Sequence, residues 1–282
     1  MMKQVGSGPA AAFILLIAFI AVIVKCCSGS SDKTKDPADN SLASNDSGAD
    51  YSFDLPVTSI SELSVETTVS TTSEPVKYQE VDFVPDDVSL VSSEYLSDIV
   101  VVGDSIAKGY GVYGRLPVDN VLAVGSVGAR NLFTYTYEYQ GFSLDLLDIL
   151  GRKLPKYIFI SVGMNDVNIL SDEEYAQVYE NNIKSILEKT PESKIFVMAV
   201  TPVASITQFT SNDKIDKFNE KLRVMVNNMD NDAVYYINAA QYLKNDYNYL
   251  ISDFSSGDGI HLAASAYDYL LSYMLTAIDW IK

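Results

Sequence analysis

The sequence predicts a three-layer α/β/α sandwich, in which helices cover both faces of a central parallel sheet. From about residue 90 to the C-terminus, short apolar runs alternate with segments of helical periodicity. The apolar runs are continuous, which is typical of parallel strands that are buried on both faces. Their regular alternation with helices favours a doubly wound sheet with right-handed crossovers.

The first predicted strand begins at Ile99 and leads through a β-branched run into Gly103-Asp104-Ser105. The glycine, carboxylate and hydroxyl that follow this strand predict a turn that carries polar side chains able to take part in a reaction. Loops at the carboxyl ends of parallel strands converge on a ligand without disturbing the packed sheet. Further strands are predicted at residues 120–124, 157–162, 194–200 and 234–237.

Amphipathic helices are predicted between these strands, and the last helix closes the domain. Ser171 and Glu174 are spaced as a capping box at the start of one of them. Apolar side chains recur at helical spacing in three segments, namely Tyr175, Tyr179, Ile183 and Ile186; Ile215, Phe218, Leu222 and Met225; and Tyr267, Leu270, Leu271, Met274 and Ile278.

The N-terminal part is predicted to be a short tail, residues 1–9, followed by a membrane anchor, residues 10–25. An unbroken apolar run extends from Ala10 to Val24. It is short for a spanning helix, which needs roughly 20 residues, and long for a signal-peptide core. We favour an uncleaved signal-anchor, because no A-x-A site follows Val24. Cleavage near Ser28 or Gly29 stays open and would give a secreted protein.

Residues 26–88 are predicted to be a disordered spacer, and residues 89–282 the globular domain. The spacer is rich in Ser, Thr and Asp and has few aliphatic residues to bury. Between Ser28 and Ser97, three lysines face fourteen acidic residues, so much of the net charge of -17 lies there. We expect the domain to be extracellular, because long following domains translocate largely regardless of charge. Nucleic acid is excluded as a partner, since it requires a basic surface.

Cysteine and histidine are scarce in the globular domain. Both cysteines, Cys26 and Cys27, follow the apolar run, and the chain has one histidine, His261. We therefore expect no disulfide in the domain and no metal, because a zinc site would need mostly carboxylates. The oligomeric state stays open.

Four short polar motifs follow strands or precede helices. They are Gly103-Asp104-Ser105, Gly125-Ser126-Val127-Gly128, Gly163-Met164-Asn165-Asp166 and Asp258-Gly259-Ile260-His261. Each alone is a weak signal, since such residues are common in turns. In this order, with the single histidine in the fourth, they resemble the SGNH/GDSL hydrolase family over roughly residues 90–282. The resemblance implies a flavodoxin-like sandwich of the SGNH-hydrolase type and serine esterase activity without an organic cofactor or metal.

The resemblance also implies a catalytic triad and an oxyanion hole. Ser105 is the implied nucleophile, His261 the general base, and Asp258 the residue that orients the imidazole. The implied oxyanion donors are the backbone N–H of Ser105, the backbone N–H of Gly128 and the side-chain amide of Asn165. Gly125 is an alternative to Gly128, because the family commonly has asparagine where this chain has Gly125.

Physical chemistry supports these roles independently of the resemblance. A serine hydroxyl is a poor nucleophile until a base removes its proton. Ester cleavage places negative charge on the carbonyl oxygen, which fixed donors stabilise. Asp258 and His261 are three residues apart at a helix entry and can face the same way. Taken alone, Asp258 is more often a helix cap and a single histidine more often a packed or surface residue, so the catalytic interpretation depends on the four motifs together.

Several neighbouring residues have two interpretations. Asp104 and Asp166 are predicted to be structural and to bond their own turns. Arg130 either binds an acidic group of the substrate or is an ordinary surface residue. Three tyrosines after the Gly128 loop either stack on sugar rings or belong to the core, namely Tyr135, Tyr137 and Tyr139.

We therefore predict a membrane-tethered, extracellular serine esterase that cleaves short acyl esters, acetyl esters first, through an acyl-enzyme on Ser105. Its expected substrate is a small acyl ester or an acylated glycan of the cell envelope. An O-acyltransferase that uses the same triad is one alternative. A non-catalytic surface-binding module on the same scaffold is the other.

Overall fold

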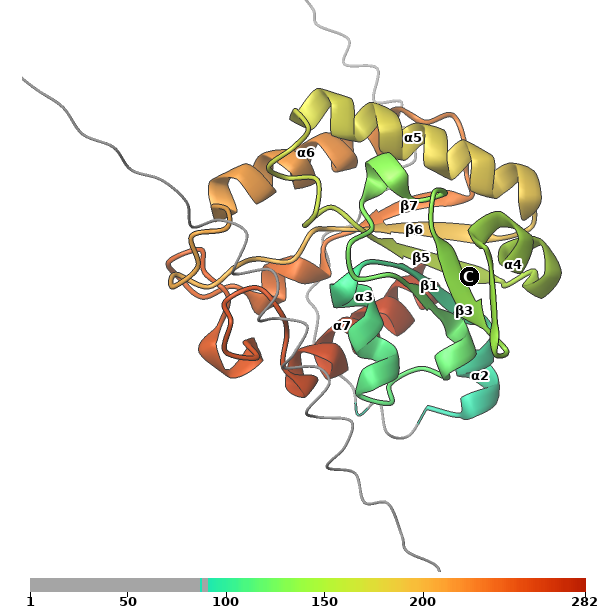
Figure 1. Cartoon of the computed structure of the whole chain (residues 1–282), viewed down its shortest axis with the longest axis horizontal. Helices are drawn as coiled ribbons and strands as arrows, with labels where there is room; N and C mark the ends of the chain where they lie inside the picture. The colour runs from blue at the N-terminus through green and yellow to red at the C-terminus, as the bar shows by residue number, and fades with distance from the viewer. Residues whose placement is uncertain (1–86, 88–90) are drawn as a thin grey trace, which may run out of the picture. The chain divides into compact units, whose positions relative to one another are not determined.

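A central sheet of five parallel strands organises the part of the chain that the computed structural model describes, residue 87 and residues 91–282. Helices lie on both sides of this sheet (Figure 1), which confirms the predicted α/β/α sandwich. The predicted tail, the anchor at 10–25 and, except for Asp87, the spacer at 26–88 lie outside the described residues. Within the described part, no helix combines the length and the apolar character needed to cross a membrane.

The strand order is β2-β1-β5-β6-β7. The chain therefore adds β2 on one side of β1 and later adds β5 on its other side. In register, Gly103 lies beside Ala123 of β2 and Ser161 of β5. The point where the order reverses, between β1 and β5, is where open α/β sheets bind ligands. The strands are β1 (Ile99–Gly103), β2 (Val121–Ala123), β5 (Tyr157–Ser161), β6 (Lys194–Met198) and β7 (Val234–Ile237).

Each face of the sheet has its own apolar core. Val100 and Val102 of β1 pack with the helices of one face, while Ile99 and Val101 pack with those of the other. This alternation explains why the strand sequences are continuously apolar. The first face carries α4 (Leu146–Lys153), α5 (Asp172–Lys189) and α6 (Asn212–Asn228), and the second carries α3 (Ser105–Val112) and α7 (Ala264–Trp280). A short helix, α2 (Ser93–Ser97), precedes β1.

The predicted helices are confirmed, including the start of α5. The Glu174 N–H donates to Ser171 Oγ at 3.2 Å, and Glu174 Oε2 accepts from the Ser171 N–H at 2.9 Å. This reciprocal pair satisfies two backbone donors that the first helical turn leaves without partners. The apolar side chains that predicted α5, α6 and α7 are all buried in these helices.

Three strands are shorter than predicted, and one of them, β5, ends at Ser161 and not at Val162. Asn120 lies in a 3₁₀ turn, η3 (Val118–Asn120), and not in β2. β6 ends at Met198 because the backbone of Val200 exchanges hydrogen bonds with the Asn219 side chain at 2.7 and 3.0 Å. The amide thus takes the place of a neighbouring strand.

A β-hairpin that the sequence did not predict follows the Gly128 loop. Its strands are β3 (Thr136–Tyr139) and β4 (Phe142–Asp145), joined at Gln140 and Gly141 with φ of 51° and 79°. Tyr137 of this hairpin is buried and packs in the core of the first face. Three further 3₁₀ turns lie in the described loops, namely η4 (Ala129–Asn131), η5 (Ala239–Leu243) and η6 (Ser252–Phe254).

Phe159→Ala is expected to lower the free energy of unfolding by about 3–5 kcal/mol, the usual cost of deleting a buried aromatic ring. Phe159 is fully buried in β5 and stacks on Phe196, with the ring centroids 4.5 Å apart. Urea denaturation checks this value. Phe142→Ala is the matched control, because Phe142 is 67% exposed and its loss should change stability by less than about 0.5 kcal/mol. Equal losses in the two variants would contradict the prediction.

Candidate active site

Ser105 is the first residue of α3 and directly follows the end of β1 through Asp104. The Asp104 carboxylate caps the helix, since its Oδ1 accepts from the Ile106 N–H at 2.9 Å. Gly103 is required by close packing, because a Cβ there would lie 2.1 Å from the carbonyl oxygen of Ser161. The sequence therefore places the Ser105 hydroxyl at the carboxyl edge of the sheet, at the strand-order reversal.

The structure brings Ser105, His261 and Asp258 into one hydrogen-bonded line. His261 Nε2 lies 2.9 Å from Ser105 Oγ, and His261 Nδ1 lies 2.5 Å from Asp258 Oδ2. With the proton on Nδ1 facing the carboxylate, Nε2 is free to accept the proton of the serine hydroxyl. Residues 156 positions apart in the chain thus have the geometry of a nucleophile, a base and an orienting carboxylate.

The environment of Asp258 keeps its carboxyl group ionised. Burial pushes the pKa of Asp258 upward, but hydrogen bonds from the His261 side chain and from the backbone N–H groups of Ile260 and His261 outweigh it. The pKa of Asp258 is therefore below its ordinary value. In the described part of the chain, no group of three or more His, Cys, Asp or Glu side chains is placed to hold a metal ion.

The loop that carries Asp258 and His261 is supported by the loop after β6. The Ala204 N–H donates to the carbonyl of Gly259 at 2.8 Å. Gly259 has φ of 82°, a left-handed conformation that favours glycine. A Cβ on Gly259 would lie 3.1 Å from Ile206 Cγ1, so the two loops are in close contact beside the imidazole.

Gly128 lies in the loop after β2, where its lack of a side chain permits a close approach. A Cβ on Gly128 would lie 2.4 Å from both carboxylate oxygens of Asp166. A Cβ on Gly125, the alternative donor, would meet no other atom within 4 Å. The Gly128 N–H, implied as an oxyanion donor, donates to Asn131 Oδ1 at 2.7 Å. Sequence reasoning missed this use of Asn131.

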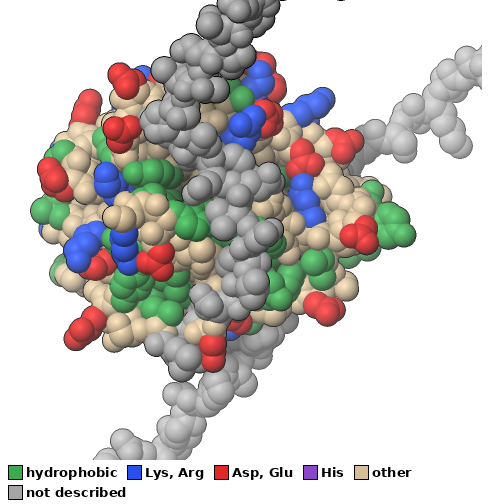
Figure 2. All heavy atoms as spheres, turned by 180° about the vertical axis from the view of Figure 1, so that it is seen from behind, with side chains coloured by type: hydrophobic (Ala, Val, Ile, Leu, Met, Phe, Trp, Pro, Cys, Tyr) green, Lys and Arg blue, Asp and Glu red, His purple; other side chains and the backbone are tan. Residues whose placement is uncertain are grey.

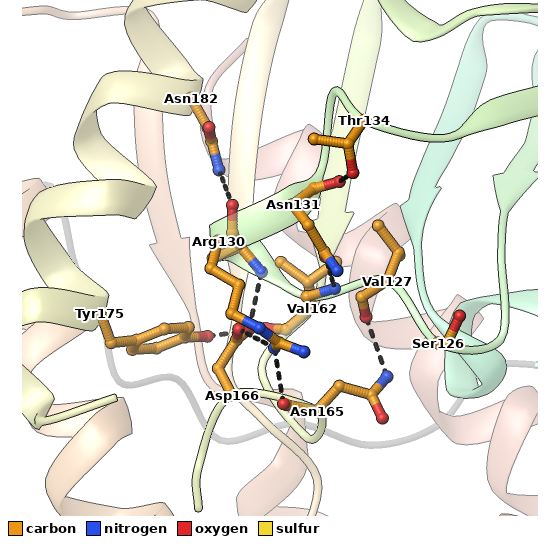
Figure 3. Close-up of polar contacts among 12 residues, drawn as sticks. Ser126, Val127, Arg130, Asn131, Thr134, Val162, Asn165, Asp166, Tyr175 and Asn182 are labelled. Atoms are coloured by element: carbon orange, nitrogen blue, oxygen red, sulfur yellow. Dashed lines mark hydrogen bonds and ion pairs between the residues drawn. The ribbon is translucent and has the colours of Figure 1, made fainter. Parts of the chain in front are cut away.

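Asn165 follows β5 and reaches across to the Gly128 loop (Figure 3). Its Nδ2 donates to the carbonyl of Val127 at 2.8 Å and to that of Gly125 at 3.2 Å. The Asn165 amide is thus joined to the loop that carries Gly128, whereas the Gly128 N–H bonds a side chain of its own loop. Both donors are engaged with acceptors of the protein itself.

The prediction for Asp104 is confirmed, and the prediction that Asp166 bonds its own turn is wrong. Asp166 Oδ2 accepts from the Ala129 N–H at 2.6 Å, and Asp166 Oδ1 pairs with Arg130 Nη1 at 2.7 Å. Both contacts cross to the loop after β2. Arg130 is accordingly an ion-pair partner of a fully buried carboxylate, which neither interpretation of Arg130 anticipated.

Asp104 is expected to make stability depend on pH. Burial raises the pKa of Asp104 from 3.8 to about 7, although N–H bonds from Ile106 and Ala107 lower it. Between about pH 4 and pH 7 the folded chain therefore holds a proton that the unfolded chain has released, so the free energy of unfolding falls as the pH rises. Asp104→Asn keeps a capping oxygen and has no proton to lose.

Urea denaturation across this pH range checks the expectation. The free energy of unfolding should fall less steeply with pH in Asp104→Asn than in the wild type. The control is Asp279→Asn, at an exposed carboxylate on the far end of α7, which should keep the wild-type slope. The same slope in all three proteins would contradict the assignment.

Comparisons with known proteins agree with this architecture. Residues 101–269 match the model of the GDSL-like Lipase/Acylhydrolase family. A search of curated proteins gave no match. The fold is similar to that of a candidate platelet activating factor from Streptococcus pneumonia, with 17% identity, a TM-score of 0.50, and coverage of 67% of this chain and 89% of that chain.

Two other solved structures are similar at lower scores. One is a GDSL-like lipase from Bacteroides thetaiotaomicron, with 15% identity, a TM-score of 0.49, and coverage of 69% of this chain and 95% of that chain. The other is a family 3 carbohydrate esterase from Clostridium thermocellum, with 16% identity, a TM-score of 0.47, and coverage of 65% of this chain and 96% of that chain. At such identities the similarity concerns the fold.

Proposed function

The chain belongs to the GDSL-like lipase/acylhydrolase family and is an ester hydrolase, and from this premise we propose that it cleaves short acyl esters, acetyl esters first, through an acyl-enzyme on Ser105. One observation carries the proposal, the hydrogen-bonded line from Ser105 Oγ through His261 to Asp258. A hydroxyl, an imidazole and an ionised carboxylate in this order are the components of a serine hydrolase triad.

In the proposed reaction, His261 Nε2 takes the proton of Ser105 as the serine oxygen attacks the acyl carbon. The carbonyl electrons move to the oxygen, and their return expels the alcohol, which receives the proton from Nε2. The acyl group is then an ester of Ser105. Water then attacks the acyl carbon while Nε2 takes its proton, and collapse of the intermediate breaks the bond to Ser105 Oγ, which takes the proton back from Nε2 as the acid is released. Asp258 holds Nδ1 protonated throughout and stabilises the imidazolium.

The proposed oxyanion donors are the N–H groups of Ser105 and Gly128 and the amide of Asn165. Fixed donors of this kind each contribute about 10²–10³ in rate. The substrate oxygen has to share or replace Asn131 Oδ1 on the Gly128 N–H and the Val127 carbonyl on Asn165. Both exchanges need only a rotation of the Asn131 and Asn165 side chains, so the backbone of the loop after β2 can stay in place.

The exposure of the His261 and Asp258 side chains supports an ester substrate whose leaving alcohol is large. The side chains of His261 and Asp258 are 44% and 47% exposed. His261 protonates the leaving alcohol, so that alcohol lies on the open side of the site, where the rest of a polysaccharide can extend into solvent. An O-acetylated glycan therefore fits the proposal better than an ester that must be enclosed on both sides.

We propose that the domain acts outside the cell, tethered by residues 10–25. The support is the apolar run from Ala10 to Val24 and the acidic composition that follows it. Membrane fractionation and protease treatment of intact cells test this. Recovery of the chain in the membrane fraction with a protease-accessible domain is expected. Recovery in the cytoplasmic fraction would overturn the tether.

The esterase proposal is tested with the full chain, purified in a mild detergent. Initial rates are measured on aryl esters of increasing acyl length and by acetate release from O-acetylated glycans. Rates should be highest for acetyl and fall as the acyl chain lengthens. Transfer of the acyl group to an added sugar in preference to water would identify an acyltransferase. No turnover on any ester would overturn the proposal.

A further inference from the structure

Asp166 is a fully buried carboxylate that the proposed reaction does not use. Its side chain has no exposed surface and lies between the loop after β5 and the loop after β2 (Figure 3). One oxygen accepts from the Ala129 N–H at 2.6 Å, and the other pairs with Arg130 Nη1 at 2.7 Å. Both partners directly follow Gly128. The carboxylate therefore holds the segment next to an implied oxyanion donor.

Arg130 joins the same two loops from the solvent side. The same Nη1 that pairs with Asp166 also donates to the carbonyl oxygen of Asn165 at 2.7 Å. The Arg130 side chain is 29% exposed, so one end of the pair reaches solvent while the carboxylate does not. Since a buried unpaired carboxylate is strongly unfavourable, this pair is expected to stay closed.

Other contacts hold the Gly128 loop at neighbouring positions. The Asn182 side chain of α5 donates to the carbonyl of Ala129 at 2.8 Å, and Asn165 donates to that of Val127 at 2.8 Å. Gly128 itself sits so close to Asp166 that any Cβ would collide with the carboxylate. Successive residues of the loop are thus fixed against α5 and against the loop after β5, which carries Asn165 and Asp166.

We propose that Asp166 and Arg130 are positioning residues of the oxyanion hole, which set the Gly128 N–H and the Asn165 amide at a fixed distance from each other and from Ser105. The proposal depends on the esterase function above. It assigns no contact with the substrate to either residue. A displacement of about 1 Å in a donor can cost about 10²-fold in rate, because the donor no longer meets the developing charge.

Asp166→Asn tests this with little change in shape. One carboxylate oxygen becomes an NH₂ group, which faces either the Ala129 N–H or Arg130, and donor then opposes donor. We expect kcat for an acetyl ester to fall about 10²-fold while KM stays close to the wild-type value. Inactivation by an alkyl phosphonate, whose tetrahedral adduct occupies the oxyanion hole, should slow in parallel.

The matched control is Asp268→Asn, which breaks the two-point contact between Asp268 of α7 and Arg115 in the turn after α3. Asp268 lies outside the Gly128 loop, so this variant should lose stability without a selective loss of kcat. An Asp166→Asn protein that folds and keeps the kcat of Asp268→Asn would overturn the proposal. A wild-type chain that is inactive on every ester would overturn the esterase function instead.

Arg130 provides a second test if Asp166→Asn does not fold. Arg130→Ala should also lower kcat while KM stays close to the wild-type value. Added methylguanidinium should restore part of the activity, because the Arg130 side chain reaches solvent. Arg130→Lys should retain more activity than Arg130→Ala. Wild-type kcat in Arg130→Ala would overturn the proposal, and so would an unaffected rate of phosphonate inactivation.

Discussion

Ser105→Ala is expected to lower kcat on acetyl esters about 10⁶-fold, the scale on which removal of the nucleophile acts in serine hydrolases. The variant leaves His261 and Asp258 in place but removes the oxygen that forms the acyl-enzyme. What remains is water attack assisted by the oxyanion donors. The free energy of unfolding should change little, since the Ser105 hydroxyl makes its hydrogen bond to a half-exposed imidazole.

Acetate release by equal amounts of wild type and variant measures this loss. A fluorophosphonate label should attach to the wild type and not to Ser105→Ala. The control is Ser143→Ala, an exposed serine in the β3–β4 hairpin that bonds Glu138 and should keep full activity. Comparable turnover by Ser105→Ala and wild type would place the nucleophile elsewhere.

The strands and helices were predictable because their signals are local. A continuously apolar strand or a capping box is contained within a few neighbouring residues, as at Ser171 and Glu174. The end of β6 was not, because it depends on Asn219, 19 positions from Val200. The β3–β4 hairpin departs from the alternation of strand and helix, and its one local signal is the Gln140-Gly141 turn, whose residues have φ of 51° and 79°.

In the candidate site, too, some features were predictable from local motifs and others depend on residues that are distant in sequence. The meeting of Ser105, His261 and Asp258 was implied by the family resemblance of the four motifs, whereas the apolar strand before Ser105 by itself indicates only a site at the edge of the sheet. Which acceptors engage Gly128 and Asn165 could not be predicted, because several carbonyl and amide groups are equally near in sequence. Asp166 illustrates this best, since an aspartate in a turn normally bonds the turn itself, and here it bonds a loop 37 positions away.

Asp258→Asn is expected to lower kcat about 10³- to 10⁴-fold, although it changes one atom. Asp258 Oδ1 accepts from the backbone N–H groups of Ile260 and His261 at 2.9 and 2.8 Å. These bonds keep the oxygen of an asparagine at the same place. Its NH₂ group must then face His261 Nδ1, which has to act as an acceptor. The proton moves to Nε2, and the imidazole can no longer take the proton of Ser105.

Kinetics on acetyl esters near neutral pH measure this effect, with thermal melting to show that the variant is folded. KM should change much less than kcat, because Asp258 touches the imidazole and not the substrate. Asp253→Asn, at an exposed carboxylate of η6 that bonds Ser252, is the control and should keep wild-type kcat. If Asp258→Asn also keeps wild-type kcat, Asp258 serves as a cap of its own turn and the tautomer of His261 is set by another group.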